Sequence, residues 1–123
     1  MYEYQAYLTR VIDGDTIDAE IDLGFNIKIK QRIRLFNIDT WEVRTRDKVE
    51  KQKGILAKAR LMDILQQNDN KFILKSHGFG KFGRVLGTLK VNSIDGDAHV
   101  HDVINKLISE GHAKKVNSGQ KLS

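Results

Sequence analysis

The chain of 123 residues contains no cysteine and no proline. Without cysteine there can be no disulfide, thiolate metal site or cysteine nucleophile, so only histidine and oxygen ligands could hold a metal. Without proline, no turn has a covalently fixed φ. No apolar run approaches the roughly 18 residues of a membrane span, and residues 1–4 do not begin a signal peptide. We therefore expect a cytoplasmic protein with no membrane partner, or a secreted one if a leader was trimmed.

Basic side chains outnumber acidic ones. The chain has 21 Lys and Arg against 16 Asp and Glu, a formal net charge of +5. A small basic domain favours polyanionic partners such as nucleic acid. The length fits one domain, and a hydrophobic content of 40% is ordinary for a globular protein. We expect one monomeric domain over residues 1–116 and a polar, disordered tail over residues 117–123.

The hydrophobic periodicity predicts several strands and two helices. Alternation predicts strands at residues 2–11, 16–22, 27–35, 72–74 and 84–91. Spacings of three and four predict helices near residues 53–67 and 103–108, the second ended by Gly111. Because three strands precede the first helix, a doubly wound sheet is excluded. The order matches a five-stranded Greek-key OB-fold barrel with flanking helices, mainly β with α.

Two short acidic segments could bind a cation. They are Asp13-Gly14-Asp15-Thr16 and Asp39-Thr40-Trp41-Glu42. Hard divalent cations take several oxygen ligands, which Asp carboxylates and a backbone carbonyl supply. Either segment by itself is also an ordinary Asp-containing turn.

Two arginines could complement such a cation. Arg34 lies on the strand that leads to Asp39, and Arg84 follows a glycine-rich connection. Guanidinium groups bind phosphate oxygens and can stabilise charge on phosphorus, as phosphodiester hydrolysis requires. Glu42 could then deprotonate an attacking water. Each arginine alone can equally be a solvated surface charge.

Three segments resemble the staphylococcal nuclease (thermonuclease) family. In the family's order they are VIDGDT at residues 11–16, RIRLFNIDTWE at residues 32–42 and KFGRVLG at residues 81–87. The resemblance extends over about residues 4–116. It implies an OB-fold barrel that hydrolyses DNA and RNA phosphodiesters with Ca²⁺.

The resemblance also implies a metal site. Asp15 and Asp39, with the carbonyl oxygen of Thr40, would bind one Ca²⁺ ion, for which other divalent ions could substitute. Asp13 would support the metal-binding turn.

The resemblance assigns further roles at the reaction centre. Glu42 takes the place of the residue usually assigned as general base. Arg34 and Arg84 take the places of the two arginines that bind phosphate and stabilise the transition state. Lys81 falls near a nucleotide phosphate.

Some positions depart from the family pattern. Trp41 stands where proline is usual, and it either stacks on a base, worth about 1–3 kcal/mol, or is a loop aromatic without a ligand. Phe82 replaces a common tyrosine and keeps an aromatic face for the substrate. The family's tyrosines after the last shared helix are missing at residues 115–118, and no third C-terminal helix is expected. Residues 44–53 lack periodicity, and we expect a mobile surface loop that contacts the substrate backbone or is simply solvated.

His99 and His101 allow a different metal site. Side chains two residues apart on a strand face one side and can hold a transition metal. No third ligand is evident, so the alternative is that both are surface or helix N-terminal residues.

The sequence therefore predicts a Ca²⁺-dependent endonuclease with little sequence preference for DNA, RNA or both. The family resemblance implies cleavage of the bond to the 5′ oxygen, which leaves a 3′-phosphate. The alternative is a non-catalytic module that binds nucleic acid or protein, for instance an adaptor or inhibitor. No serine elbow motif or P-loop is present.

Overall fold

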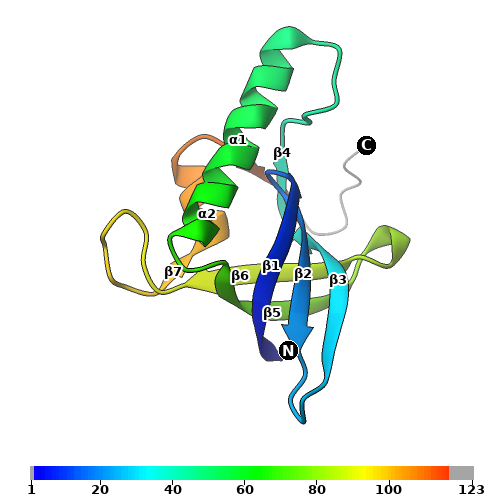
Figure 1. The fold of residues 1–123 in the computed structure, drawn as a ribbon. Helices are drawn as coiled ribbons and strands as arrows, with labels where there is room; N and C mark the ends of the chain where they lie inside the picture. The colour runs from blue at the N-terminus through cyan, green and yellow to red at the C-terminus, as the bar shows by residue number, and fades with distance from the viewer. Residues whose placement is uncertain (1, 117–123) are drawn as a thin grey trace.

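The structure is a computed structural model and describes residues 2–116. Its elements follow the chain as shown in Figure 1: β1 (Glu3–Asp13), β2 (Thr16–Asp22), β3 (Lys28–Leu35), β4 (Ile38–Thr40), α1 (Lys48–Gln66), β5 (Lys71–Phe79), one turn of 3-10 helix (Lys81–Gly83), β6 (Val85–Val91), β7 (His101–Asp102), α2 (Val103–Ser109) and β8 (Ala113–Lys115).

Five strands close into a barrel. Antiparallel pairing runs in the order β3-β2-β1-β5-β6, and a parallel pairing between β3 and β6 joins the two ends. At this seam Ile33 lies opposite Val85 and Leu35 opposite Gly87. The predicted OB-type architecture, mainly β with two flanking helices, is therefore confirmed.

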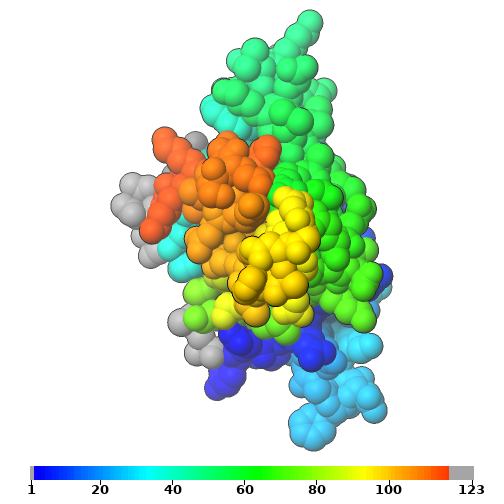
Figure 2. Space-filling model, turned by 90° about the vertical axis from the view of Figure 1, so that its left-hand side faces the viewer, coloured from blue at the N-terminus to red at the C-terminus, as the bar shows by residue number. Residues whose placement is uncertain are grey.

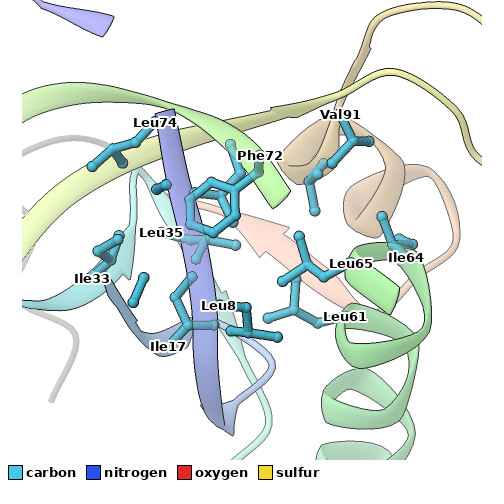
Figure 3. Close-up of a cluster of buried hydrophobic side chains, with 14 of the residues drawn as sticks. Leu8, Ile17, Ile33, Leu35, Leu61, Ile64, Leu65, Phe72, Leu74 and Val91 are labelled. Carbon is cyan, nitrogen blue, oxygen red and sulfur yellow. The ribbon is translucent and has the colours of Figure 1, made fainter. Parts of the chain in front are cut away.

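The core lies between the barrel and α1. Figure 3 shows Leu61 and Leu65 of α1 pointing toward strand residues such as Ile17 and Leu35. These side chains and that of Ile64 are fully buried. Burial of each such side chain contributes about 1.5–3 kcal/mol. The second half of α1 is therefore firmly fixed on the barrel, and the first half rises beyond it (Figure 1).

The second helix lies beside the first. α2 contacts α1, β6 and β8, and the loop before β7 projects next to it in Figure 2. Neither helix has the length and apolar character that a membrane crossing needs, within residues 2–116.

The structure corrects part of the predicted loop at residues 44–53. α1 begins at Lys48, because the Asp47 carboxylate accepts hydrogen bonds from the amides of Val49 and Glu50 and so caps the helix. The first turn of α1 carries exposed polar side chains, so no hydrophobic period marks it in the sequence. The prediction of a loop is wrong for residues 48–53.

Other boundaries differ where pairing decides them. β5 extends over Lys71–Phe79, beyond the predicted residues 72–74, since it pairs with both β1 and β6. The short strands β4 and β8 pair with each other and were not predicted. Gly111 follows α2 with a φ of 79°, as predicted. The predicted tail at residues 117–123 lies outside the described residues.

Candidate active site

The centre of the site is a pair of aspartates from two elements. Asp15 lies in the turn between β1 and β2, and Asp39 lies in β4. Asp15 is buried; one carboxylate oxygen accepts from the Thr16 hydroxyl at 2.9 Å and the other from the Thr40 amide at 3.1 Å. The Asp15 carboxylate therefore links the turn to β4 and fixes their separation.

Arg34 lies between the two aspartates. Its Nη2 is 3.3 Å from Asp15 Oδ2 and 3.7 Å from Asp39 Oδ1, and its Nη1 donates to the Leu35 carbonyl at 3.0 Å. The guanidinium group is mostly buried. The structure thus brings Asp15, Asp39, Thr40 and Arg34 together.

The strand register decides which basic residue of β3 joins the site. Arg32 lies opposite Asp18 on β2 and forms an exposed ion pair with it at 2.8 Å. Arg34 lies opposite Thr16, which carries no charge. Only Arg34 of these two is therefore left to pair with the acidic residues.

The two carboxylates oppose each other electrostatically. Burial raises the pKa of Asp39, and the nearby Asp15 charge raises it further, although Arg34 partly offsets both. Burial also raises the pKa of Asp13, and the Val43 backbone partly offsets this rise. The environment of the pair therefore favours an added positive charge.

The donor set fits a hard divalent cation. Asp15, Asp39 and Thr40 offer oxygen donors only, the type that Ca²⁺ and Mg²⁺ prefer. No group of three or more His, Asp or Glu side chains is arranged to hold a metal within residues 2–116. A bound ion would accordingly need water or substrate oxygens to complete its coordination.

Arg84 lies beside this centre but does not contact the aspartates. Its Nε donates to the Lys81 carbonyl at 3.3 Å, and its guanidinium carbon is 5.5 Å from the centre of the Phe82 ring. Arg84 and Phe82 line an open cavity of about 720 Å³, together with Asp13 and Thr16 of the acidic turn. The second arginine therefore faces a groove that shares Asp13 and Thr16 with the acidic turn, but Asp15, Asp39 and Arg34 do not line that groove.

The remaining predicted residues are exposed. Phe82 is 90% exposed, with a φ of 62°, and Lys81 is exposed next to it. Glu42 is also exposed, and its carboxylate has no hydrogen-bond or ion-pair partner within residues 2–116. Trp41 is 41% exposed, and the Lys53 ammonium lies 4.8 Å from its ring centre. These side chains can thus reach a bound molecule.

The strand β8 borders the site from the C-terminal side. Its Lys114 lies opposite Asp39 in the β4–β8 pair. Lys115 and Val116, which stand where the resemblance leads us to expect tyrosines, therefore lie next to the candidate metal site. The other two such positions, 117 and 118, lie outside the described residues.

Sequence reasoning missed two residues of α1 that contact the site. A Cβ atom at Gly54 would lie 2.7 Å from the Glu42 carbonyl oxygen, and one at Gly14 would lie 2.8 Å from Ala57 Cβ. An isolated glycine within a helical pattern often marks such close packing, and Gly54 gave that signal.

The histidine pair does not form a metal site. The His99 ring bonds to the Asp97 carboxylate, and His101 Nε2 lies 3.0 Å from the Asp97 carbonyl oxygen. Across residues 2–116, these rings are not part of any group of three or more His, Asp or Glu side chains that could hold a metal ion. They lie in the exposed loop and in β7, just before α2, as the surface alternative predicted.

The comparisons with known proteins agree with the predicted resemblance. A sequence model of the family described as staphylococcal nuclease homologue matches residues 32–122, roughly three quarters of the chain. No curated protein matches the chain. The matched range contains Arg34, Asp39, Glu42 and Arg84, while the turn with Asp15 precedes it. The chain belongs to the staphylococcal nuclease homologue family.

Proposed function

We propose that the protein is a Ca²⁺-dependent nuclease that hydrolyses phosphodiester bonds of DNA, RNA or both with little sequence preference. The observation that carries this proposal is the position of the Arg34 guanidinium, 3.3 Å from Asp15 and 3.7 Å from Asp39. One cluster of side chains thus offers oxygen ligands for a cation and a fork of donors for a phosphate.

The proposed metal ligands are Asp15, Asp39 and the carbonyl oxygen of Thr40. A Ca²⁺ ion bound there would supply Lewis-acid stabilisation of the charge on a phosphoryl oxygen. The buried Asp15 carboxylate, held by Thr16 and the Thr40 amide, keeps these ligands in place without substrate.

The proposed catalytic residues are Arg34, Arg84 and Glu42. Arg34 and Arg84 bind phosphate oxygens and stabilise the charge that develops on phosphorus. Glu42 takes the proton of the attacking water, and its solvent exposure leaves it accessible to that water. The water oxygen forms a bond to phosphorus as the bond to the 5′ oxygen breaks, which leaves a 3′-phosphate and a 5′ oxygen that takes a proton from solvent to become a hydroxyl.

The proposed substrate contacts are exposed side chains. Lys81 interacts with a phosphate, and the exposed faces of Phe82 and Trp41 stack on bases. Such contacts carry little base information, which fits weak sequence preference.

The proposal is tested by digestion of plasmid DNA and of RNA with Ca²⁺ or with a chelator. We expect cleavage that requires the ion, and a loss of at least about 100-fold in kcat for Glu42→Gln, because a general base contributes about that much. Glu50→Gln, a nearby glutamate in the first turn of α1, serves as the matched control and should retain activity.

Two outcomes would contradict the proposal. A wild-type protein that binds nucleic acid but never cleaves it would be a binding module. A Glu42→Gln variant as fast as wild type would remove Glu42 from the reaction.

A further inference from the structure

The segment that carries Glu42 is positioned by contacts with other elements rather than by a rigid backbone of its own. The chain has no proline, so no residue after β4 has a covalently fixed φ. Within residues 2–116, the Glu42 carboxylate itself makes no hydrogen bond or ion pair. Its position must therefore come from its neighbours and from the backbone contacts of Trp41, Glu42 and Val43.

The closest of these contacts is with Gly54 of α1. A Cβ atom there would lie 2.7 Å from the carbonyl oxygen of Glu42, 2.8 Å from its carbonyl carbon and 2.8 Å from the carbonyl oxygen of Trp41. Real Cβ atoms do not come this close to backbone atoms. Glycine at position 54 is therefore what allows the Glu42 backbone to lie directly on the helix.

The same face of α1 contacts the acidic turn one helical turn later. Ala57 is three residues after Gly54, so the two share a face. A Cβ atom at Gly14 would lie 2.8 Å from Ala57 Cβ and 3.2 Å from Thr40 Oγ1. In Figure 1, α1 passes the β1–β2 turn and β4 at the upper end of the barrel. One rigid helix thus contacts both the turn with Asp15 and the segment with Glu42.

Trp41, the residue before Glu42, has a second contact with α1. The Lys53 ammonium lies 4.8 Å from the centre of the Trp41 ring, a distance at which cation–π attraction acts. Trp41 and Glu42 are therefore both held against α1.

We propose that Gly54 is a positioning residue for the reaction: the face of α1 formed by Gly54 and Ala57 sets the distance from Glu42 to the aspartate pair. This inference rests on the proposed function, because it acts through the role of Glu42. A side chain at position 54 would push the Glu42 backbone away from the helix and leave Asp15 and Asp39 in place.

The test is a double-mutant cycle of Gly54→Ala with Glu42→Gln. We expect Gly54→Ala to lower kcat by about 10- to 100-fold, since a misplacement of about 1 Å costs on that order. The apparent Ca²⁺ affinity should change by less than about two-fold, because the atoms nearest to a Cβ at position 54 belong to Trp41 and Glu42 and not to the proposed metal ligands. In the Glu42→Gln background, Gly54→Ala should lower kcat no further, since residues that act through one another are not additive.

Ala59→Gly is the matched control. Ala59 is exposed on the same helix, so this change weakens the helix without touching the segment at residues 41–43. Its kcat should equal that of wild type. Equal losses of kcat from Gly54→Ala in both backgrounds, or no loss in either, would overturn the inference.

A second measurement tests the inference without relying on activity. Trp41 is the only tryptophan, so its fluorescence reports on this segment alone. We expect its time-resolved anisotropy in the wild-type protein to show a ring that moves with the whole molecule. Gly54→Ala should add a fast local motion. A freely rotating Trp41 in wild type overturns the inference, whereas absence of Ca²⁺-dependent cleavage with a fixed Trp41 overturns only the proposed function.

Discussion

At the scale of single residues, the candidate site is defined by an imbalance of charge. Two carboxylates, Asp15 and Asp39, share one guanidinium, that of Arg34, so the trio keeps one net negative charge. The raised pKa of Asp39 reflects the same imbalance, because burial and the Asp15 charge oppose its ionised form. A divalent cation would reverse the sign of the site, and Arg34 could then turn to a substrate phosphate.

The hydroxyl and the carbonyl oxygen of Thr40 can be tested separately. Its hydroxyl is buried and has no hydrogen-bond partner among residues 2–116. Thr40→Val removes this unsatisfied group and keeps the carbonyl oxygen, so we expect a gain of about 1 kcal/mol in the free energy of unfolding. The Ca²⁺ dependence of cleavage should stay unchanged. Urea denaturation in a chelator and a Ca²⁺ titration of activity measure the two quantities.

Thr9→Val is the control for this prediction. Thr9 is exposed on β1, so the free energy of unfolding of the Thr9→Val variant should stay within about 0.5 kcal/mol of wild type. A Thr40→Val variant that needs much more Ca²⁺ would make the hydroxyl, not the carbonyl, the ligand.

At the scale of elements, α1 serves two purposes along its length. Its second half contributes Leu61, Ile64 and Leu65 to the core (Figure 3). Its first half has little apolar burial and instead contacts the site through Gly54 and Ala57. The beginning of α1 therefore depends on its cap more than on the hydrophobic core.

Removal of that cap should act on stability and activity together. Asp47→Ala leaves the amides of Val49 and Glu50 without their acceptor, so we expect a loss of about 1 kcal/mol. Fraying of the first turn should also mobilise the adjacent segment with Glu42 and lower kcat. Chemical denaturation and initial-rate kinetics check both effects.

Asp102 supplies the comparison for this prediction. It caps α2 with the same pattern of two amide hydrogen bonds, away from Glu42. Asp102→Ala should lower stability by a similar amount and leave kcat unchanged. A Asp47→Ala variant with normal kcat would show that the start of α1 does not influence Glu42.

At the scale of the whole molecule, one arginine joins parts that are distant in sequence. Arg60 of α1 pairs with Asp63 at 2.6 Å, with Asp95 at 2.7 Å and with Glu110 at 2.7 Å. These partners lie in α1, in the loop before β7 and after α2. Arg60 therefore holds the two helices and the loop together on one side of the barrel.

This cluster predicts how stability depends on pH. Hydrogen bonds from Arg60 lower the pKa of Asp95 from 3.8 to about 2, and they lower the pKa of Glu110 as well. A carboxyl whose pKa is lower in the folded state stabilises the protein above its ordinary pKa and ceases to do so as the pH falls through the folded value. The stabilisation should therefore be lost between the ordinary value of 3.8 and about 2.

Arg60→Gln should remove this dependence. We expect a melting temperature about 5 °C lower at neutral pH, a shift ordinary for loss of such a contact in a domain of this size. The slope of stability against pH should flatten in the acid window. Arg32→Gln, which breaks the exposed pair with Asp18, should change little, because exposed ion pairs contribute little. The measurement is thermal unfolding of both proteins from pH 2 to pH 7. Parallel curves of melting temperature against pH for wild type and Arg60→Gln would contradict the prediction.

The sequence by itself determined the barrel strands, the core helix and the identity of the acidic and basic candidates. Alternation on β3 was visible because that strand buries one face. The apolar spacing that indicated α1, through Ile55, Leu56, Ala59, Met62 and Leu65, did not identify its buried face, because only Leu65 of these residues is buried. The segments with Asp15 and Asp39 were visible because turns that bind cations need particular side chains.

Only the tertiary structure decided which candidates meet. Arg32 and Arg34 are equivalent in the alternation of β3, and although the family resemblance assigned Arg34, its physical reason is the register against Asp18 and Thr16. The packing of Gly54 against the Glu42 backbone and the pairing of β4 with β8 also join residues far apart in the chain. Periodicity indicates only whether a side chain is buried. It cannot specify which distant residue that side chain contacts, and the site is formed by such contacts.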